Sequence, residues 1–176
     1  MGHDAHRRAA LVFTLFDANG NGVLDADDFA LMTERVLAVA ADSPAADRQA
    51  LADSLEHYWR VLSTTLDANG DGVISPEEFR GFVLDPELFG ATAARFADAL
   101  AALGDPEHDG LIERDRFVAL MLAIGFEKEN TEALFDAFGP DAEDRIAVEV
   151  WAEGIRDYYA PEKSGIPGDR LVPQSA

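Results

Sequence analysis

Apolar residues recur every three or four positions along most of the chain, which is the spacing that lines one face of an α-helix. Short segments rich in Asp, Asn, Gly and Pro interrupt this pattern. It predicts an all-α protein with helices over residues 4–16, 26–41, 44–66, 76–84, 86–103, 114–124, 128–138 and 147–159. Repeated Pro and Gly residues from Pro161 onward predict an irregular tail, 161–176. Ile166, Leu171 and Val172 leave open whether that tail folds back over a hydrophobic groove.

Two of the polar interruptions have the same length and the same order of side chains. They are Asp17-Ala-Asn-Gly-Asn-Gly-Val-Leu-Asp-Ala-Asp-Asp28 and Asp67-Ala-Asn-Gly-Asp-Gly-Val-Ile-Ser-Pro-Glu-Glu78. Each carries oxygen-bearing side chains at loop positions 1, 3, 5, 9 and 12, with glycine at position 6 and an aliphatic residue at position 8. A hard divalent cation takes six to eight oxygens at about 2.3–2.6 Å, and alternate residues of a short loop can supply them. This spacing is that of the EF-hand calcium loop.

The predicted calcium ligands follow directly from these positions. In the first loop they are Asp17, Asn19, Asn21, Val23, Asp25 and Asp28, and in the second Asp67, Asn69, Asp71, Val73, Ser75 and Glu78. The two valines would bind through their main-chain carbonyls, and position 9 directly or through water. One such loop alone could be an ordinary polar turn. Two loops, each followed by an aromatic residue (Phe29 and Phe79), favour two Ca²⁺ sites.

The two loops differ at position 12. Glu78 is long enough to turn both oxygens onto an ion, which gives the sevenfold coordination that calcium accepts and Mg²⁺ resists. Asp28 is one methylene shorter. We therefore expect Asp28 to bind through one oxygen, so that the Asp17–Asp28 loop tolerates Mg²⁺ better than the Asp67–Glu78 loop does.

Two further loops keep the frame of this pattern but lose its ligands. The segment 105–116 has acidic residues at positions 1, 3 and 5, but Arg116 stands at position 12, where its permanent positive charge opposes a cation. This leaves open a structural loop, which we favour, and a calcium loop in which Asp115 replaces the position-12 ligand. The segment 139–150 lacks the position-1 acid and ends at Val150, so we predict that it binds no calcium. We also predict that Ile112 pairs with Ile146 as Leu24 pairs with Ile74.

These residues resemble the calerythrin and sarcoplasmic calcium-binding protein group over roughly residues 5 to 160. The resemblance implies four EF-hand units, two intact and two degenerate, in two packed lobes. We expect an N-terminal pair over 1–84, with loops 17–28 and 67–78, and a degenerate pair over 85–160, with loops 105–116 and 139–150. It also implies a compact helical protein that buffers calcium.

The composition of the chain limits the classes of molecule that we expect it to bind. With 34 acidic and 14 basic residues, the net charge of −20 argues against nucleic acid and anionic membranes and favours cations. The chain has no cysteine, which excludes disulfides and thiolate metal sites and fits the cytoplasm. The N-terminal apolar stretch is too short and too interrupted for a secretory signal. We expect a cytoplasmic monomer.

Three function classes remain to be ranked. A calcium sensor exposes a pliable, methionine-lined groove to a protein partner. Apart from the first residue, the chain holds only Met32 and Met121, both at helical spacing among apolar neighbours. We therefore rank an intracellular calcium buffer above a sensor. An enzyme ranks third, because the chain has no nucleophile or phosphate-binding motif and its loop carboxylates are already assigned to ions.

Overall fold

The computed structural model describes residues 3–67 and 69–173, and within these the chain is mostly helical. Ala68 in the second loop, and residues 1–2 and 174–176 of the predicted terminal segments, lie outside the described residues. The elements are α1 (His3–Phe16), α2 (Ala26–Val39), α3 (Ala45–Leu66), α4 (Pro76–Val83), α5 (Pro86–Leu103), β1 (Leu111–Glu113), α6 (Arg114–Ile124), α7 (Lys128–Ala137), β2 (Arg145–Ala147), α8 (Val148–Tyr159) and the 3-10 turn η1 (Pro167–Leu171). The predicted all-α class is confirmed, and each helix lies close to its expected range.

Local side-chain chemistry fixes where several helices begin. At α4, the Ser75 hydroxyl accepts from the Glu78 N–H, the Glu78 carboxylate accepts from the Ser75 N–H, and Pro76 takes the first helical position. The same reciprocal cap joins Asp25 and Asp28 at α2. Such caps satisfy N–H groups that the helix itself cannot pair. Both caps bring position 12 of a polar loop beside the first turn of a helix.

Two short backbone pairings join the loops. Leu24 and Ile74 exchange N–H···O bonds of 2.9 Å in both directions. Strands β1 and β2 run antiparallel, with Ile112 opposite Ile146. The loop 17–28 therefore lies beside the loop 67–78, and 105–116 lies beside 139–150. Both pairings have the predicted partners, while the division of the chain into four units stays a prediction.

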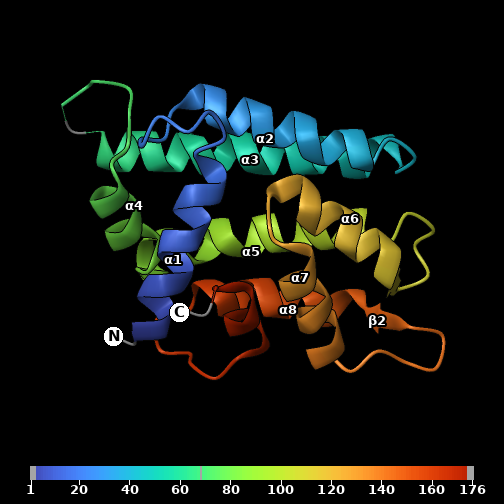
Figure 1. Ribbon diagram of the computed structural model, residues 1–176. Coiled ribbons are helices and arrows are strands. Elements are labelled where there is room, and N and C mark those ends of the chain that lie inside the picture. The colour runs from blue at the N-terminus through green and yellow to red at the C-terminus, as the bar shows by residue number, and fades with distance from the viewer. Residues whose placement is uncertain (1–2, 68, 174–176) are drawn as a thin grey trace.

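The helices stack in layers around one continuous core. In Figure 1, α2 and α3 lie side by side, α5 runs beneath them, and α8 lies below α5. Helix α5 packs against both α3 and α8, so the two halves of the chain share a boundary. Tyr58 of α3 is fully buried there, with ring centroids at 5.2 Å from Phe16 and 4.8 Å from Phe89, and its hydroxyl lies 3.4 Å from that of Tyr159. One buried cluster thus spans both predicted lobes.

The segment that follows α8 packs on the body of the molecule. After Pro161 the chain turns back toward α1 (Figure 1), where the Arg7 guanidinium donates to the Pro173 carbonyl at 2.8 Å. It forms η1, which packs on α7 and α8, and Leu171 and Val172 are buried. The fold-back that the sequence left open therefore occurs in the described part of the tail.

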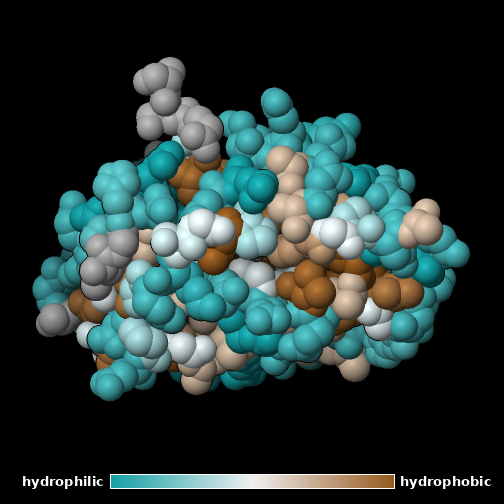
Figure 2. All heavy atoms as spheres, turned by 90° about the horizontal axis from the view of Figure 1, so that it is seen from below, coloured by the Kyte–Doolittle hydropathy of each residue, from teal (hydrophilic) through white to brown (hydrophobic). Residues whose placement is uncertain are grey.

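The surface is largely hydrophilic. Figure 2 shows the face seen from below, where small hydrophobic patches interrupt charged and polar residues. The large apolar side chains that stand exposed among the described residues are Leu88, Leu122 and Val150. Within the same residues, every helix is too short or too polar to cross a membrane.

Candidate metal centre

The loop between α1 and α2 folds around the oxygens of its own side chains. The Asp17 carboxylate accepts from the Asn21 N–H (3.1 Å) and, through its second oxygen, from the Gly22 N–H (2.8 Å). The Asn21 amide oxygen accepts from the Val23 N–H (3.1 Å). Gly22 has a φ of 86°, where a side chain would be strained. The donors predicted at positions 1, 3 and 5 are therefore drawn over one tight turn.

Asp28 closes this loop from the start of α2. It is fully buried, and its two carboxylate oxygens accept separate backbone N–H groups, Asn19 at 3.2 Å and Asp25 at 3.0 Å. Burial raises the pKa of Asp28, the negative charges of Asp25 and Asp17 raise it further, and the two N–H bonds oppose the shift. A cation beside these three carboxylates would relieve their repulsion.

The loop between α3 and α4 repeats the turn around its position-1 carboxylate. The Asp67 carboxylate accepts from Asp71 N–H and Gly72 N–H, both at 2.9 Å, and the Asp71 carboxylate accepts from Val73 N–H at 3.1 Å. Glu78 differs from Asp28 because its side chain is exposed and, within the described residues of this loop, one of its oxygens accepts a backbone N–H, that of Ser75. The two position-12 carboxylates thus differ in burial as well as in length.

The chemistry of both loops fits a hard divalent cation. All twelve predicted donors are oxygens, which Ca²⁺ and Mg²⁺ prefer and softer metals do not. In the described part of the chain, no three His, Cys, Asp or Glu side chains are gathered closely enough to hold a metal. Each loop therefore carries its donors on one short segment, with the carboxylates engaged by backbone N–H groups. A bound ion would supply the positive charge that collects them.

The third loop keeps the turn but gives position 12 another task. The Asp105 carboxylate accepts from Asp109 N–H (3.0 Å) and Gly110 N–H (2.8 Å), as Asp17 and Asp67 do in their loops. The Arg116 guanidinium instead donates to the Leu103 carbonyl (2.9 Å) and pairs with Asp42 at 2.7 Å. Arg116 therefore ties this loop to the segment between α2 and α3.

Arginines also neutralise the acids of the fourth loop. Arg145 pairs with Asp141 (3.3 Å) and Glu143 (2.7 Å). Arg114 pairs with Asp144 and Asp136, each at 2.6 Å, and its guanidinium carbon lies 4.6 Å from the centre of the Phe135 ring. The bond from Arg114 lowers the pKa of Asp144. The Arg145 guanidinium thus takes up the two acids at positions 3 and 5, which an intact hand would offer to an ion.

The sequence indicated the role of Arg116 only in part, and it did not indicate Arg114 or Arg145. Position 12 identified Arg116 as unfavourable for an ion. Arg114 stands at position 10, which supplies no ligand, and Arg145 stands at position 7, where the main-chain carbonyl and not the side chain would bind. The acid that Arg114 contacts at Asp136 comes from another helix. A surplus of arginine beside loops that have lost their ligands is the sequence signal that could have found them.

Comparison with known proteins also singles out the first two loops. The sequence profile of the family described as EF hand matches residues 9–33 and 65–83, the segments that hold the first two loops. Calerythrin from Saccharopolyspora erythraea is 24% identical over 155 residues, which covers 84% of this chain and 87% of calerythrin.

Two solved structures extend the likeness to the fold. One is a Streptomyces coelicolor calcium-binding protein, whose structure is described as the structural basis for prokaryotic calcium-mediated regulation by that protein. It superposes with a TM-score of 0.72 at 25% identity, and the superposition covers 90% of this chain and 99% of the other. A sarcoplasmic calcium-binding protein from amphioxus superposes with a TM-score of 0.66 at 20% identity over the whole of both chains. The chain therefore carries two segments that match the EF-hand family, is a homologue of calerythrin, and has structural neighbours among the bacterial and sarcoplasmic calcium-binding proteins.

Proposed function

We propose that the protein binds two calcium ions, one in each of the loops 17–28 and 67–78, and acts as a calcium buffer inside the cell. The ligands are the twelve residues named above. The loops 105–116 and 139–150 bind none. The protein works as a cytoplasmic monomer and has no catalytic role, and its charge of −20 keeps it from nucleic acid and membranes.

One observation supports this proposal above the others. The two loops share the same internal hydrogen bonds, from position 5 and position 6 N–H groups to the position-1 carboxylate, and they are joined by the Leu24–Ile74 pairing. A backbone that already follows the turn needs little ordering when an ion arrives, which favours binding. Paired loops also place the two ions beside each other.

Burial of the methionines supports buffering over sensing. Met32 and Met121 are both within the core, at 1% and 3% exposure. The core around Tyr58 is rich in aromatic rings, which pack with fixed geometry. Such an interior is suited to holding ions without presenting a new surface.

Isothermal titration with Ca²⁺ tests the stoichiometry. We expect two sites in the intact chain and one site in each of Asp17→Ala and Asp67→Ala, because each variant loses the position-1 carboxylate of a single loop. Asp109→Ala removes an acid at position 5 of the third loop and serves as the matched control, with two sites retained. Three sites in the intact chain, or two in both loop variants, would contradict the proposal.

The same titration in millimolar Mg²⁺ compares the two loops. We expect Mg²⁺ to weaken calcium binding more in Asp67→Ala, where only the loop closed by Asp28 remains, than in Asp17→Ala, where Glu78 can offer both oxygens. Equal weakening in the two variants would contradict the predicted difference between Asp28 and Glu78.

A calcium sensor is the second candidate. The Streptomyces coelicolor neighbour is described in terms of calcium-mediated regulation, and this chain carries exposed Leu88 and Leu122 on α5 and α6. Fluorescence of a hydrophobic dye, measured before and after Ca²⁺ is added, separates the two functions. A buffer should change dye fluorescence by less than about twofold, whereas a sensor that opens a groove should raise it several-fold.

A further inference from the structure

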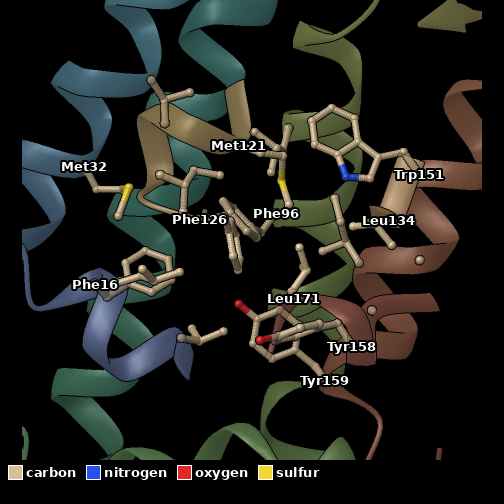
Figure 3. Close-up of a pocket in the computed structure, with 18 of the residues that line it drawn as sticks. Phe16, Met32, Phe96, Met121, Phe126, Leu134, Trp151, Tyr158, Tyr159 and Leu171 are labelled. Carbon is tan, nitrogen blue, oxygen red and sulfur yellow. The ribbon is translucent and has the colours of Figure 1, made fainter. Parts of the chain in front are cut away.

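An apolar cavity lies at the centre of the molecule, between the two halves of the chain. Figure 3 shows Phe16, Phe96, Phe126 and Leu171 directed toward it, with Trp151 at one side. Its free volume is about 60 Å³. An engineered apolar cavity of about 150 Å³ stays dry and holds benzene. At this volume the cavity is too small for a ring but has room for part of an alkyl chain.

The tail supplies part of the wall of this cavity. Leu171 of η1 lines it from the tail, and Tyr158 and Tyr159 line it from the end of α8. Leu171 is 5% exposed. Withdrawing its side chain would enlarge the cavity and open it on the side of the tail. The segment 166–172, which we call the strap, thus forms one wall of the cavity.

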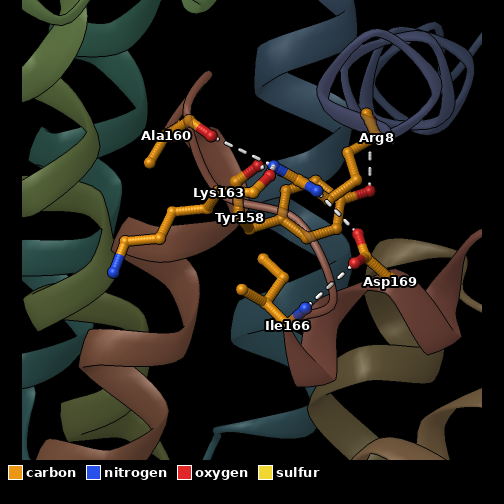
Figure 4. A network of polar contacts seen from close by, with 6 residues as sticks. All are labelled: Arg8, Tyr158, Ala160, Lys163, Ile166 and Asp169. Carbon is orange, nitrogen blue, oxygen red and sulfur yellow. Dashed lines mark hydrogen bonds and ion pairs between the residues drawn. The ribbon is translucent and has the colours of Figure 1, made fainter. Parts of the chain in front are cut away.

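A buried cation holds the strap in place. Arg8 of α1 has no exposed side-chain surface, and its guanidinium pairs with Asp169 of the strap at 2.6 Å. It also donates to the carbonyls of Tyr158 (2.8 Å), Ala160 (3.1 Å) and Lys163 (3.0 Å). Figure 4 shows these contacts converging on one side chain. The three carbonyls precede the strap, so they can stay on Arg8 when the strap leaves.

Arg8 and the cavity share a wall. The Tyr158 ring lines the cavity, lies 5.8 Å from the guanidinium carbon of Arg8, and its hydroxyl donates to the Arg8 carbonyl at 3.1 Å. The strap spans this wall, with the Asp169 carboxylate on Arg8 and the Leu171 side chain at the cavity. It therefore presents one carboxylate and one aliphatic group to two adjoining parts of a single site.

Loss of the strap alone would leave Arg8 without its anion. An arginine cannot release its proton, and an unpaired buried cation is strongly unfavourable. Whatever replaces the strap must therefore bring a negative charge to Arg8 and apolar atoms to the cavity. A neutral hydrocarbon meets only the second need.

We propose that Arg8 and the cavity form a binding site for a medium-chain aliphatic monocarboxylate, which enters by displacing the strap. The carboxylate takes the place of Asp169 on Arg8, and the alkyl chain takes the place of Leu171 and the free space behind it. Because the strap is tethered and always close by, it competes at high effective concentration and keeps the affinity of the intact protein low.

Octanoate and octan-1-ol are the probes, since they share a carbon chain and differ in charge. Trp151 lines the cavity and reports binding by fluorescence in a Trp59→Phe background, where it is the remaining tryptophan. Titrations in about 0.15 M salt limit the long-range repulsion of the acidic protein, because the Debye length there is about 8 Å.

Asp169→Asn removes the competing carboxylate but keeps the shape of the strap. We expect it to raise the affinity for octanoate by about tenfold or more, and that for octan-1-ol by less than about threefold, since a hydrogen bond to a charged group is stronger than one between neutral groups. Glu162→Gln makes the same charge change on an exposed residue near the strap and is the matched control, with both affinities unchanged.

Two further variants examine the two ends of the site. Leu171→Ala enlarges the cavity and should raise the affinity for both probes. Arg8→Gln should abolish the preference for octanoate over octan-1-ol, and the comparison of Asp169→Asn with Glu162→Gln decides the matter if this variant fails to fold. An equal gain for both probes in Asp169→Asn, or no response of Trp151 to octanoate in either strap variant, would overturn the proposal.

Discussion

Removing calcium with a chelator is expected to lower the melting temperature by about 10–20 °C. An ion that binds only the folded state, present at 100 times its dissociation constant, stabilises it by about 2.7 kcal/mol, so two sites contribute roughly 5 kcal/mol. For a chain of 150–250 residues, 1 kcal/mol moves the melting temperature by about 2–4 °C. Differential scanning calorimetry in calcium and then in chelator measures the shift.

The molecular reason for this shift lies in the first loop. Without an ion, Asp28 is buried beside the negative charges of Asp17 and Asp25, and burial raises its pKa. Unfolding exposes Asp28 to water and separates these charges, so the folded protein without an ion is less stable than the folded protein with one. A variant that carries both Asp17→Ala and Asp67→Ala is the control, and its melting temperature should not respond to the chelator. An unchanged melting temperature in the unmodified protein would contradict calcium binding at these loops.

Tyr58→Ala should destabilise the protein by about 3–5 kcal/mol, the range for replacing a large buried aromatic residue. Tyr58 contacts rings from both halves of the chain, including Phe16, Phe96 and Phe89. We expect a fall of about 6–20 °C in melting temperature with a single transition, because one core joins the halves. Thermal unfolding followed by circular dichroism measures both features.

Tyr58→Phe is the matched control for that variant. It keeps the ring and removes only the hydroxyl, whose contact with the Tyr159 hydroxyl is long at 3.4 Å. The expected loss is within about 1.5 kcal/mol. Two separate transitions in Tyr58→Ala would contradict a continuous core and favour two lobes that unfold independently.

Much of the fold could be predicted because its signals are local. Ser75 and Pro76 mark the start of α4 within one turn, and the reciprocal cap with Glu78 is present as the spacing suggests. The pairing of Leu24 with Ile74 follows from the shared position 8 of two matching loops. In each case the chemistry is complete within a few residues of one loop.

Most contacts that the sequence did not reveal join residues that lie far apart along the chain. Arg8 and Asp169 are 161 positions apart, and neither belongs to a motif. Arg116 reaches Asp42 across 74 positions. A charged residue on an acidic chain has many possible partners, and only the folded backbone selects one. The docking of the tail and the pairs made by Arg114 and Arg116 are therefore products of tertiary structure, whereas Arg145 pairs with acids of its own loop.

The arginine pairs around the third and fourth loops have a consequence for how fast the protein can respond. Arg114, Arg116 and Arg145 stay protonated, so the ion pairs that they make around the third and fourth loops do not depend on a bound metal. If the first two loops bind calcium as we propose, these contacts persist when calcium is scarce and those loops are empty. Rebinding of calcium then requires only that the short loops close around the ion, which takes microseconds or less. The protein does not have to refold.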